Sequence, residues 1–183
     1  ATIAVESSGG TSALTFDGGG GRTFDAGGGG TYDNITINKS SGSTLTLGSN
    51  LNMDGNLTIT AGTFAAGANT ITCGGNWANS GTFTAGTSTV TLNGANQSIS
   101  GSTTFYNLTK TITTARTLTF SAGSSTTITG TATLQGASGQ LLSLASSTPG
   151  TRWNFNLSST ASKSISYVNV QDSDASGSDA SRK

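Results

Sequence analysis

The sequence contains no histidine, one cysteine (Cys73), one proline (Pro149), and only eight basic and eight acidic residues among 183. Without histidine, the chain lacks His-based catalytic triads and imidazole metal ligands. A single cysteine rules out an internal disulfide. With a net charge of zero, the chain lacks the excess of basic residues that is typical of a nucleic-acid binder. No apolar run approaches the roughly 18–20 residues that span a membrane. We therefore expect no cofactor, no metal, no nucleic-acid partner and no transmembrane segment.

The residues that are abundant favour strands and tight turns. Thr, Val and Ile recur throughout, and these residues suit pleated strands. The 27 glycines, with many Ser and Asn, suit the turns between strands. Runs such as 57–59, 70–72 and 89–91 alternate apolar and hydroxyl residues, which is the period of a half-buried strand. No window is dominated by strong helix formers, so the sequence predicts a nearly all-β fold.

Internal repetition indicates which all-β fold. Residues 62–72 match residues 81–91 at an offset of 19, and residues 32–36 match residues 105–109 at an offset of 73, which we interpret as about four units. Units this short cannot bury their own apolar face and must stack on their neighbours. The sequence thus predicts a single-stranded parallel β-helix (β-solenoid) with coils of about 18–20 residues. Right-handed coiling is expected because parallel crossovers prefer it. Nine or ten such coils would form a rod of about 45 Å.

The chain is predicted to be one β-solenoid domain over residues 1–183. Within it, residues 1–30 form glycine-rich N-terminal coils, residues 31–170 form the repeat body, and residues 171–183 form a polar tail. We interpret the glycine runs near the N-terminus as tight corners rather than as linker, because strand-like segments flank them.

The tail begins like a calcium-binding loop. Asp172, Asp174 and Ser176 occupy positions 1, 3 and 5 and Gly177 occupies position 6, which is the spacing of the first oxygen ligands and the glycine in such loops. The twelfth position should carry a bidentate Glu but is Lys183. The sequence therefore favours a solvated turn over a calcium site.

Several segments carry a resemblance to a known group of proteins. Residues 55–64, 75–83, 97–109 and 165–170 resemble repeat segments of very large Thr/Ser/Gly/Asn-rich bacterial cell-surface proteins, the haemagglutinin-like and autotransporter-type adhesins. The resemblance covers about residues 31–175. It implies a secreted, extracellular, right-handed β-helix that serves as scaffold, and it transfers no catalytic residue.

From the repeats and this resemblance we expect a non-catalytic extracellular structural protein. It would be a segment or self-assembling subunit of a bacterial surface fibre, filament or adhesin. The end strands of a solenoid carry unpaired backbone groups, so the expected partner is another copy in head-to-tail stacking, or a neighbouring segment of a longer chain. Glycans or surfaces are weaker candidate partners for the Ser/Thr/Asn exterior.

An ice-binding β-helix is one alternative. Thr-x-Thr triplets recur at offsets of 19, 20 and 18 and predict an outward hydroxyl array that orders water. Lys110 interrupts the third triplet, and a bulky side chain there would spoil the flatness of the array. The predicted array consists of Thr70, Thr72, Thr89, Thr91, Thr109, Thr111, Thr127 and Thr129.

Carbohydrate binding and polysaccharide degradation are further alternatives. The aromatic residues could form a sugar platform, but core positions are their commoner place. A β-helical glycosidase needs paired carboxylates, and we interpret the acidic residues as scattered at intervals that are not multiples of one coil, so catalysis is not expected. Cys73 is interpreted as a small, half-buried apolar filler. The residues considered are the aromatic Phe64, Trp77, Phe83, Phe105, Tyr106 and Phe120 and the acidic Glu6, Asp17, Asp25, Asp33 and Asp54.

Six Asn-x-Ser/Thr sequons complete the candidate sites. In a chain this rich in Asn, Ser and Thr, most sequons arise by composition, and glycan attachment outside the cell stays open. The six asparagines are Asn34, Asn38, Asn56, Asn96, Asn107 and Asn156.

Overall fold

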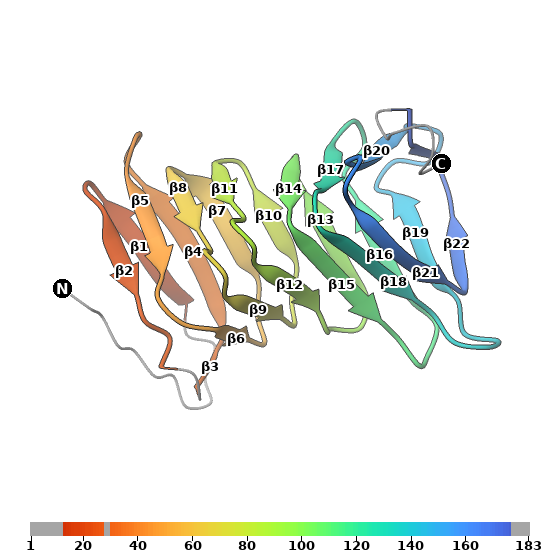
Figure 1. Ribbon diagram of the computed structural model, residues 1–183, viewed down its shortest axis with the longest axis horizontal. Coiled ribbons are helices and arrows are strands. Elements are labelled where there is room, and N and C mark those ends of the chain that lie inside the picture. Colours follow the sequence, from red (N-terminus) through yellow and green to blue (C-terminus); the bar gives the residue numbers. More distant parts are fainter. Residues whose placement is uncertain (1–12, 28–29, 177–183) are drawn as a thin grey trace.

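The computed structural model describes residues 13–27 and 30–176. They form an elongated stack of β-coils that follow one another along the long axis in sequence order (Figure 1). Every described strand pairing in the sheets is parallel, and the described residues contain no α-helix and so none that could cross a membrane. The predicted parallel β-solenoid is confirmed.

Each coil contributes one strand to each of three walls. Wall 1 is an eight-stranded sheet and wall 2 a seven-stranded sheet, whereas wall 3 consists of two four-stranded sheets in succession. Wall 1 contains β1 (Ala13–Gly18), β4 (Asn34–Lys39), β7 (Leu57–Ala61), β10 (Trp77–Asn79), β13 (Gln97–Ser100), β16 (Arg116–Phe120), β19 (Leu142–Ser146) and β22 (Val168–Val170). Wall 2 contains β3 (Thr31–Tyr32), β6 (Leu51–Met53), β9 (Thr70–Cys73), β12 (Thr89–Leu92), β15 (Asn107–Thr111), β18 (Thr131–Gln135) and β21 (Ser162–Ser166). Wall 3 contains β2 (Arg22–Phe24), β5 (Thr44–Leu47), β8 (Thr63–Ala65) and β11 (Thr82–Thr84), then β14 (Thr103–Phe105), β17 (Ser125–Ile128), β20 (Trp153–Leu157) and β23 (Ser173–Asp174).

The repeat with an offset of 19 is confirmed as one coil. Phe64 pairs with Phe83 and Ile71 pairs with Val90, so residues 62–72 lie directly beneath residues 81–91. The match at an offset of 73 has a different origin. Residues 34–35 lie in β4 on wall 1, whereas residues 107–108 lie in β15 on wall 2, so this offset equals three coils plus two further walls.

Coil length varies more than the sequence repeats led us to expect. Val90 pairs with Leu108 at an offset of 18, but Ala132 pairs with Lys163 at an offset of 31. Longer corner loops, such as residues 147–152 between β19 and β20, account for the added length. Wall 1 therefore spans seven coil steps, and not nine or ten, which at about 4.8 Å per step makes a stack of about 34 Å.

The core runs along the axis between the three walls. Trp77 is fully buried, and its ring centroid lies 4.8 Å from that of Phe83 and 5.1 Å from that of Phe105. Phe64 and Phe120 are also buried, as expected for core aromatics, whereas Tyr106 is half-buried. Burying a large apolar side chain contributes about 1.5–3 kcal/mol, so the stacked inward positions stabilise the fold.

Two kinds of residue shape the corners. Gly18 ends β1 and residues 19–21 form the turn to β2, which confirms the corner interpretation for this glycine run. Asparagines tie successive coils together, because a side-chain Oδ1 accepts a hydrogen bond from a backbone N–H one coil further on. This bond runs from Asn56 N to Asn34 at 2.8 Å, from Asn76 N to Asn56 at 2.7 Å and from Ser98 N to Asn76 at 2.8 Å.

Candidate functional site

The outward face of wall 2 carries two parallel lines of hydroxyl and amide side chains, which we call the hydroxyl rows. They arise because apolar and hydroxyl residues alternate along each strand, so the hydroxyl residues point away from the core. The register of β6, β9, β12, β15, β18 and β21 aligns them across the wall. The first row is Asn50, Thr70, Thr89, Asn107, Thr131 and Ser162, and the second is Asn52, Thr72, Thr91, Thr109, Thr133 and Ser164.

The rows contain five of the eight threonines in the predicted array: Thr70, Thr72, Thr89, Thr91 and Thr109. Thr111 lies beside Gln135, one position beyond the rows. Thr127 lies in β17 on wall 3, and the hydroxyl of Thr129, just after it, donates to the carbonyl oxygen of Phe105 at 3.3 Å.

Coil length explains these differences. Asn107 pairs with Thr89 at an offset of only 18, which shifts the third triplet so that Thr109 pairs with Thr91 and not with Thr89. The expected interference from Lys110 is wrong, because this side chain points inward and is 0% exposed. Sequence reasoning missed Asn107 because this coil offset is only 18 residues, and it missed Thr131 and Thr133 because the next coil is six residues longer.

The side chains of the hydroxyl rows are neutral, and five of the twelve take part in hydrogen bonds within the protein: Asn50, Asn52, Thr89, Asn107 and Ser164. Asn107 Nδ2 donates to Thr89 Oγ1 at 3.0 Å. Among the described residues, the hydroxyls of Thr72, Thr91 and Thr109 have no protein hydrogen-bond partner. Because threonine is branched at Cβ, its χ1 angle is restricted, so these hydroxyls are held in place for water or a ligand.

Beneath wall 2 lies a buried polar cluster that the sequence did not reveal. Lys110 Nζ donates to Gln97 Oε1 at 2.6 Å and to the carbonyl oxygen of Gly94 at 2.9 Å, and Gln97 Nε2 donates to the carbonyl oxygen of Cys73 at 2.9 Å. Burial lowers the pKa of Lys110 to about 8, with a further contribution from the charge of Arg116. The cluster binds three successive coils to one another.

Cys73 lies in the core, as expected of a small filler, but it is fully buried rather than half-buried. Burial raises the pKa of its thiol to about 11. The thiol is therefore protonated at neutral pH and shielded from solvent, a combination that makes cysteine unreactive.

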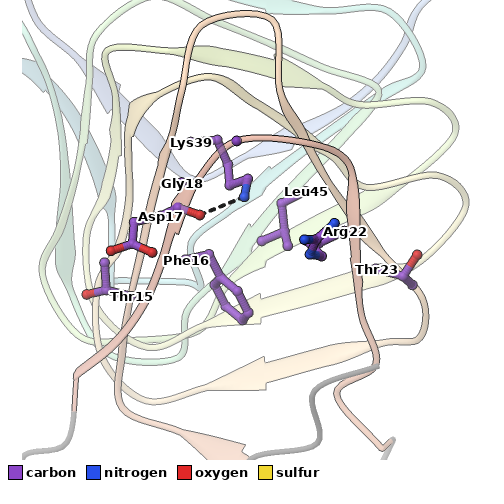
Figure 2. A pocket seen from close by; sticks show the side chains of 9 residues that line it. Thr15, Phe16, Asp17, Gly18, Arg22, Thr23, Lys39 and Leu45 are labelled. Carbon is purple, nitrogen blue, oxygen red and sulfur yellow. Dashed lines mark hydrogen bonds between the residues drawn. The ribbon is translucent and has the colours of Figure 1, made fainter. Parts of the chain in front are cut away.

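A cavity of about 350 Å³ lies beside the first coil (Figure 2). Phe16 and Leu45 supply apolar lining, and Arg22 and Lys39 supply positive charge. The amine of Lys39 already has a partner within the protein, because its Nζ donates to the carbonyl oxygen of Asp17 at 2.6 Å. Among the described residues of this lining, Asp17 contributes the one carboxylate, so these residues do not supply the pair of carboxylates that glycoside hydrolysis requires.

Two acidic residues are related by one coil, contrary to the sequence interpretation. Tyr32 pairs with Met53, so the residues that follow, Asp33 and Asp54, occupy equivalent corners of neighbouring coils.

Asp25 accepts a hydrogen bond from Ser49 Oγ at 2.6 Å, which lowers the pKa of its carboxyl. A general acid needs the opposite shift. Glu6 lies outside the described residues.

The acidic tail segment is bonded to the protein. Asp172 Oδ2 accepts from the backbone N–H of Gly150 at 3.1 Å, and Asp174 pairs with Arg152 at 3.2 Å. Within residues 13–27 and 30–176, no group of three His, Cys, Asp or Glu side chains is placed to hold a metal ion. The end of the calcium-like pattern, from Gly177 to Lys183, lies outside the described residues.

The sequon asparagines have different environments. The Oδ1 atoms of Asn34, Asn56, Asn96 and Asn107 each accept a hydrogen bond from the backbone one coil further on, at 2.7–2.9 Å. Their first role is thus to join coils. Asn38 is exposed on wall 1. In β20 the side chain of Asn156 has a buried Oδ1 without a partner.

The C-terminal coil exposes residues at core positions. Ile165 pairs with buried Leu134, and Val170 pairs with buried Leu144, so both occupy inward positions of the stack. Ile165 is nevertheless 38% exposed and Val170 49% exposed. Among the described residues no strand pairs with the outer edges of β21, β22 and β23.

Comparison of the chain with protein-family models, with curated proteins and with solved structures finds no match. Two geometric features of the described residues bear on function: the hydroxyl rows of wall 2 and the open C-terminal coil.

Proposed function

We propose that this protein is a non-catalytic structural segment of a bacterial cell-surface fibre or adhesin, secreted and assembled by end-to-end stacking of β-coils. The observation that carries the proposal is the exposed core at the C-terminal coil, where Ile165 and Val170 continue the buried inward rows. Contiguous exposed apolar side chains on a protein surface mark interaction sites. The extracellular location is supported by the neutral Ser/Thr/Asn exterior and by the resemblance to adhesin repeats.

The partner that fits is the first coil of a second copy. The three walls end in β22, β21 and β23, and they begin with β1, β3 and β2. Each of these strands has one edge that pairs with no described strand. Stacking the second copy head to tail would pair β22 with β1, β21 with β3 and β23 with β2, all parallel. Such heterologous contacts do not close on themselves and build open filaments.

Sedimentation velocity and negative-stain microscopy of the purified chain over a range of concentrations test this proposal. We expect particles that are longer than one stack, which measures about 34 Å. Val170→Lys places a charge on the exposed core end and should leave single stacks. Thr58→Lys places the same charge on the outward face of wall 1 and should not affect assembly.

Single short stacks at every concentration, for wild type and both variants alike, would contradict assembly between copies. The surface location is checked separately by labelling intact and lysed source cells with antibodies to the purified chain. Labelling that appears only after lysis would contradict an extracellular role.

A further inference from the structure

The hydroxyl rows of wall 2 form a regular two-dimensional net. Neighbouring strands lie about 4.8 Å apart, and residues two apart on one strand lie about 6.6 Å apart. Between β9 and β18, each strand presents one residue to each row, and seven of these eight residues are threonine, with Asn107 as the exception. Hexagonal ice exposes rows of oxygen atoms with comparable repeats on its crystal faces. The net therefore has the periodicity needed to hold water in an ice-like arrangement.

The chemistry of the rows suits water rather than a charged or soluble ligand. Thr72, Thr91 and Thr109 have no hydrogen-bond partner among the described residues, so their hydroxyls are available to water. Their methyl groups lie beside the hydroxyls and limit the orientations that bound water adopts. Restricted χ1 angles hold neighbouring hydroxyls in place before binding, which lowers the entropy lost on binding.

Wall 1 offers an internal comparison, because it is also neutral over most of its face but is less regular. Its row through Asn34, Asn56 and Asn76 joins coils through Oδ1 atoms that accept backbone hydrogen bonds, as Asn50 and Asn107 also do in the first row of wall 2. The neighbouring row passes from Thr58 to Ala78, where the hydroxyl is missing. Regularity thus distinguishes wall 2 from a wall that is merely polar.

From this geometry we infer that the outward face of wall 2 binds ice, with the hydroxyl rows as the contact surface. The function is separate from end-to-end stacking, because the rows lie along the side of the stack and the stacking surfaces lie at its ends. In an assembled fibre the rows of successive copies would extend the ice-binding face.

The test is thermal hysteresis and inhibition of ice recrystallisation by the purified chain. Thr91→Tyr and Thr109→Tyr each place a bulky side chain at the centre of the rows and should abolish both activities. Thr58→Tyr makes the same change on wall 1 and should leave both unchanged. Circular dichroism must show the same fold for all three variants, and Val170→Lys in each background separates the result from assembly.

Three outcomes would overturn the inference. The wild-type chain could show no thermal hysteresis and no effect on recrystallisation. Thr58→Tyr could reduce activity as strongly as Thr91→Tyr, which would place the activity elsewhere. The chain could bind crystalline cellulose without thermal hysteresis, which would assign the rows to a glycan. None of these results bears on whether the chain forms filaments, so the two proposals fail independently.

Discussion

Replacing Trp77 with alanine is the most direct test of how the coils stack. The indole ring is fully buried between successive coils and contacts the rings of Phe83 and Phe105. Its Nε1–H donates to Thr103 Oγ1 at 3.3 Å, but this oxygen also accepts from Asn79 Nδ2 at 3.1 Å. The substitution therefore leaves no buried acceptor without a partner, and its cost comes from the cavity.

Removing a buried aromatic side chain costs about 3–5 kcal/mol, so we expect the free energy of unfolding to fall by about 4 kcal/mol. Native proteins are stable by roughly 5–15 kcal/mol, so this loss is a large part of the total. Urea denaturation followed by far-UV circular dichroism and by tryptophan fluorescence, which in the variant comes from Trp153 alone, measures the change. Coincidence of the two transitions checks that unfolding is two-state.

Tyr167→Ala is the matched control, because this aromatic side chain is 54% exposed. Its removal should change the free energy of unfolding by no more than about 0.5 kcal/mol, as for most surface substitutions. A loss below about 1 kcal/mol for Trp77→Ala would refute the reasoning. It would mean that the ring is not enclosed by neighbouring coils and that the strand register is different.

Three further predictions concern single positions. Gly101→Ala should lower Tm strongly, because an added Cβ would collide with the carbonyl oxygen of Asn79. Gly123 has a similar positive φ but open space around it, so Gly123→Ala should lower the free energy of unfolding by only about 1 kcal/mol. The pKa of Lys110 is about 8 when folded and 10.5 ordinarily, so the unfolded chain binds more protons between these values and stability should rise with pH. Urea titrations between pH 8 and 9, below the ordinary thiol pKa of 9.0, should show this rise in wild type and not in Lys110→Met. The Cys73 thiol, with its pKa raised to about 11 by burial, should react with a thiol reagent only after urea unfolding, and rapid labelling of the native chain would contradict its burial.

Several features of this protein could be read from the sequence because they depend on local patterns. Alternation at residues 70–72 and 89–91 predicted outward threonines and inward Ile71 and Val90, and the structure places them so. The repeat at an offset of 19 predicted that Phe64 lies over Phe83, which is confirmed. Local alternation decides which side of a strand a residue occupies, so these predictions needed no distant contacts.

Other features depend on contacts between walls and on the length of each corner loop. Lys110 was expected to disturb the outward face, but the alternation of its own strand directs it inward, where Gln97 and Gly94 satisfy its amine. That pairing needs residues brought together from two walls. The equivalence of Asp33 and Asp54 was missed for a related reason, because it requires a coil offset of 21 rather than 19.

The sequence by itself determined the class of fold, the inward and outward sides of the strands, and the neutral hydroxyl-rich exterior. Only the tertiary structure decided which threonines share a face. Thr127 belongs to wall 3 and Thr133 to wall 2, because corner loops of different length shift the register from one coil to the next. A strand pattern is a local property, whereas the alignment of residues across a wall depends on the lengths of all the corner loops between its strands.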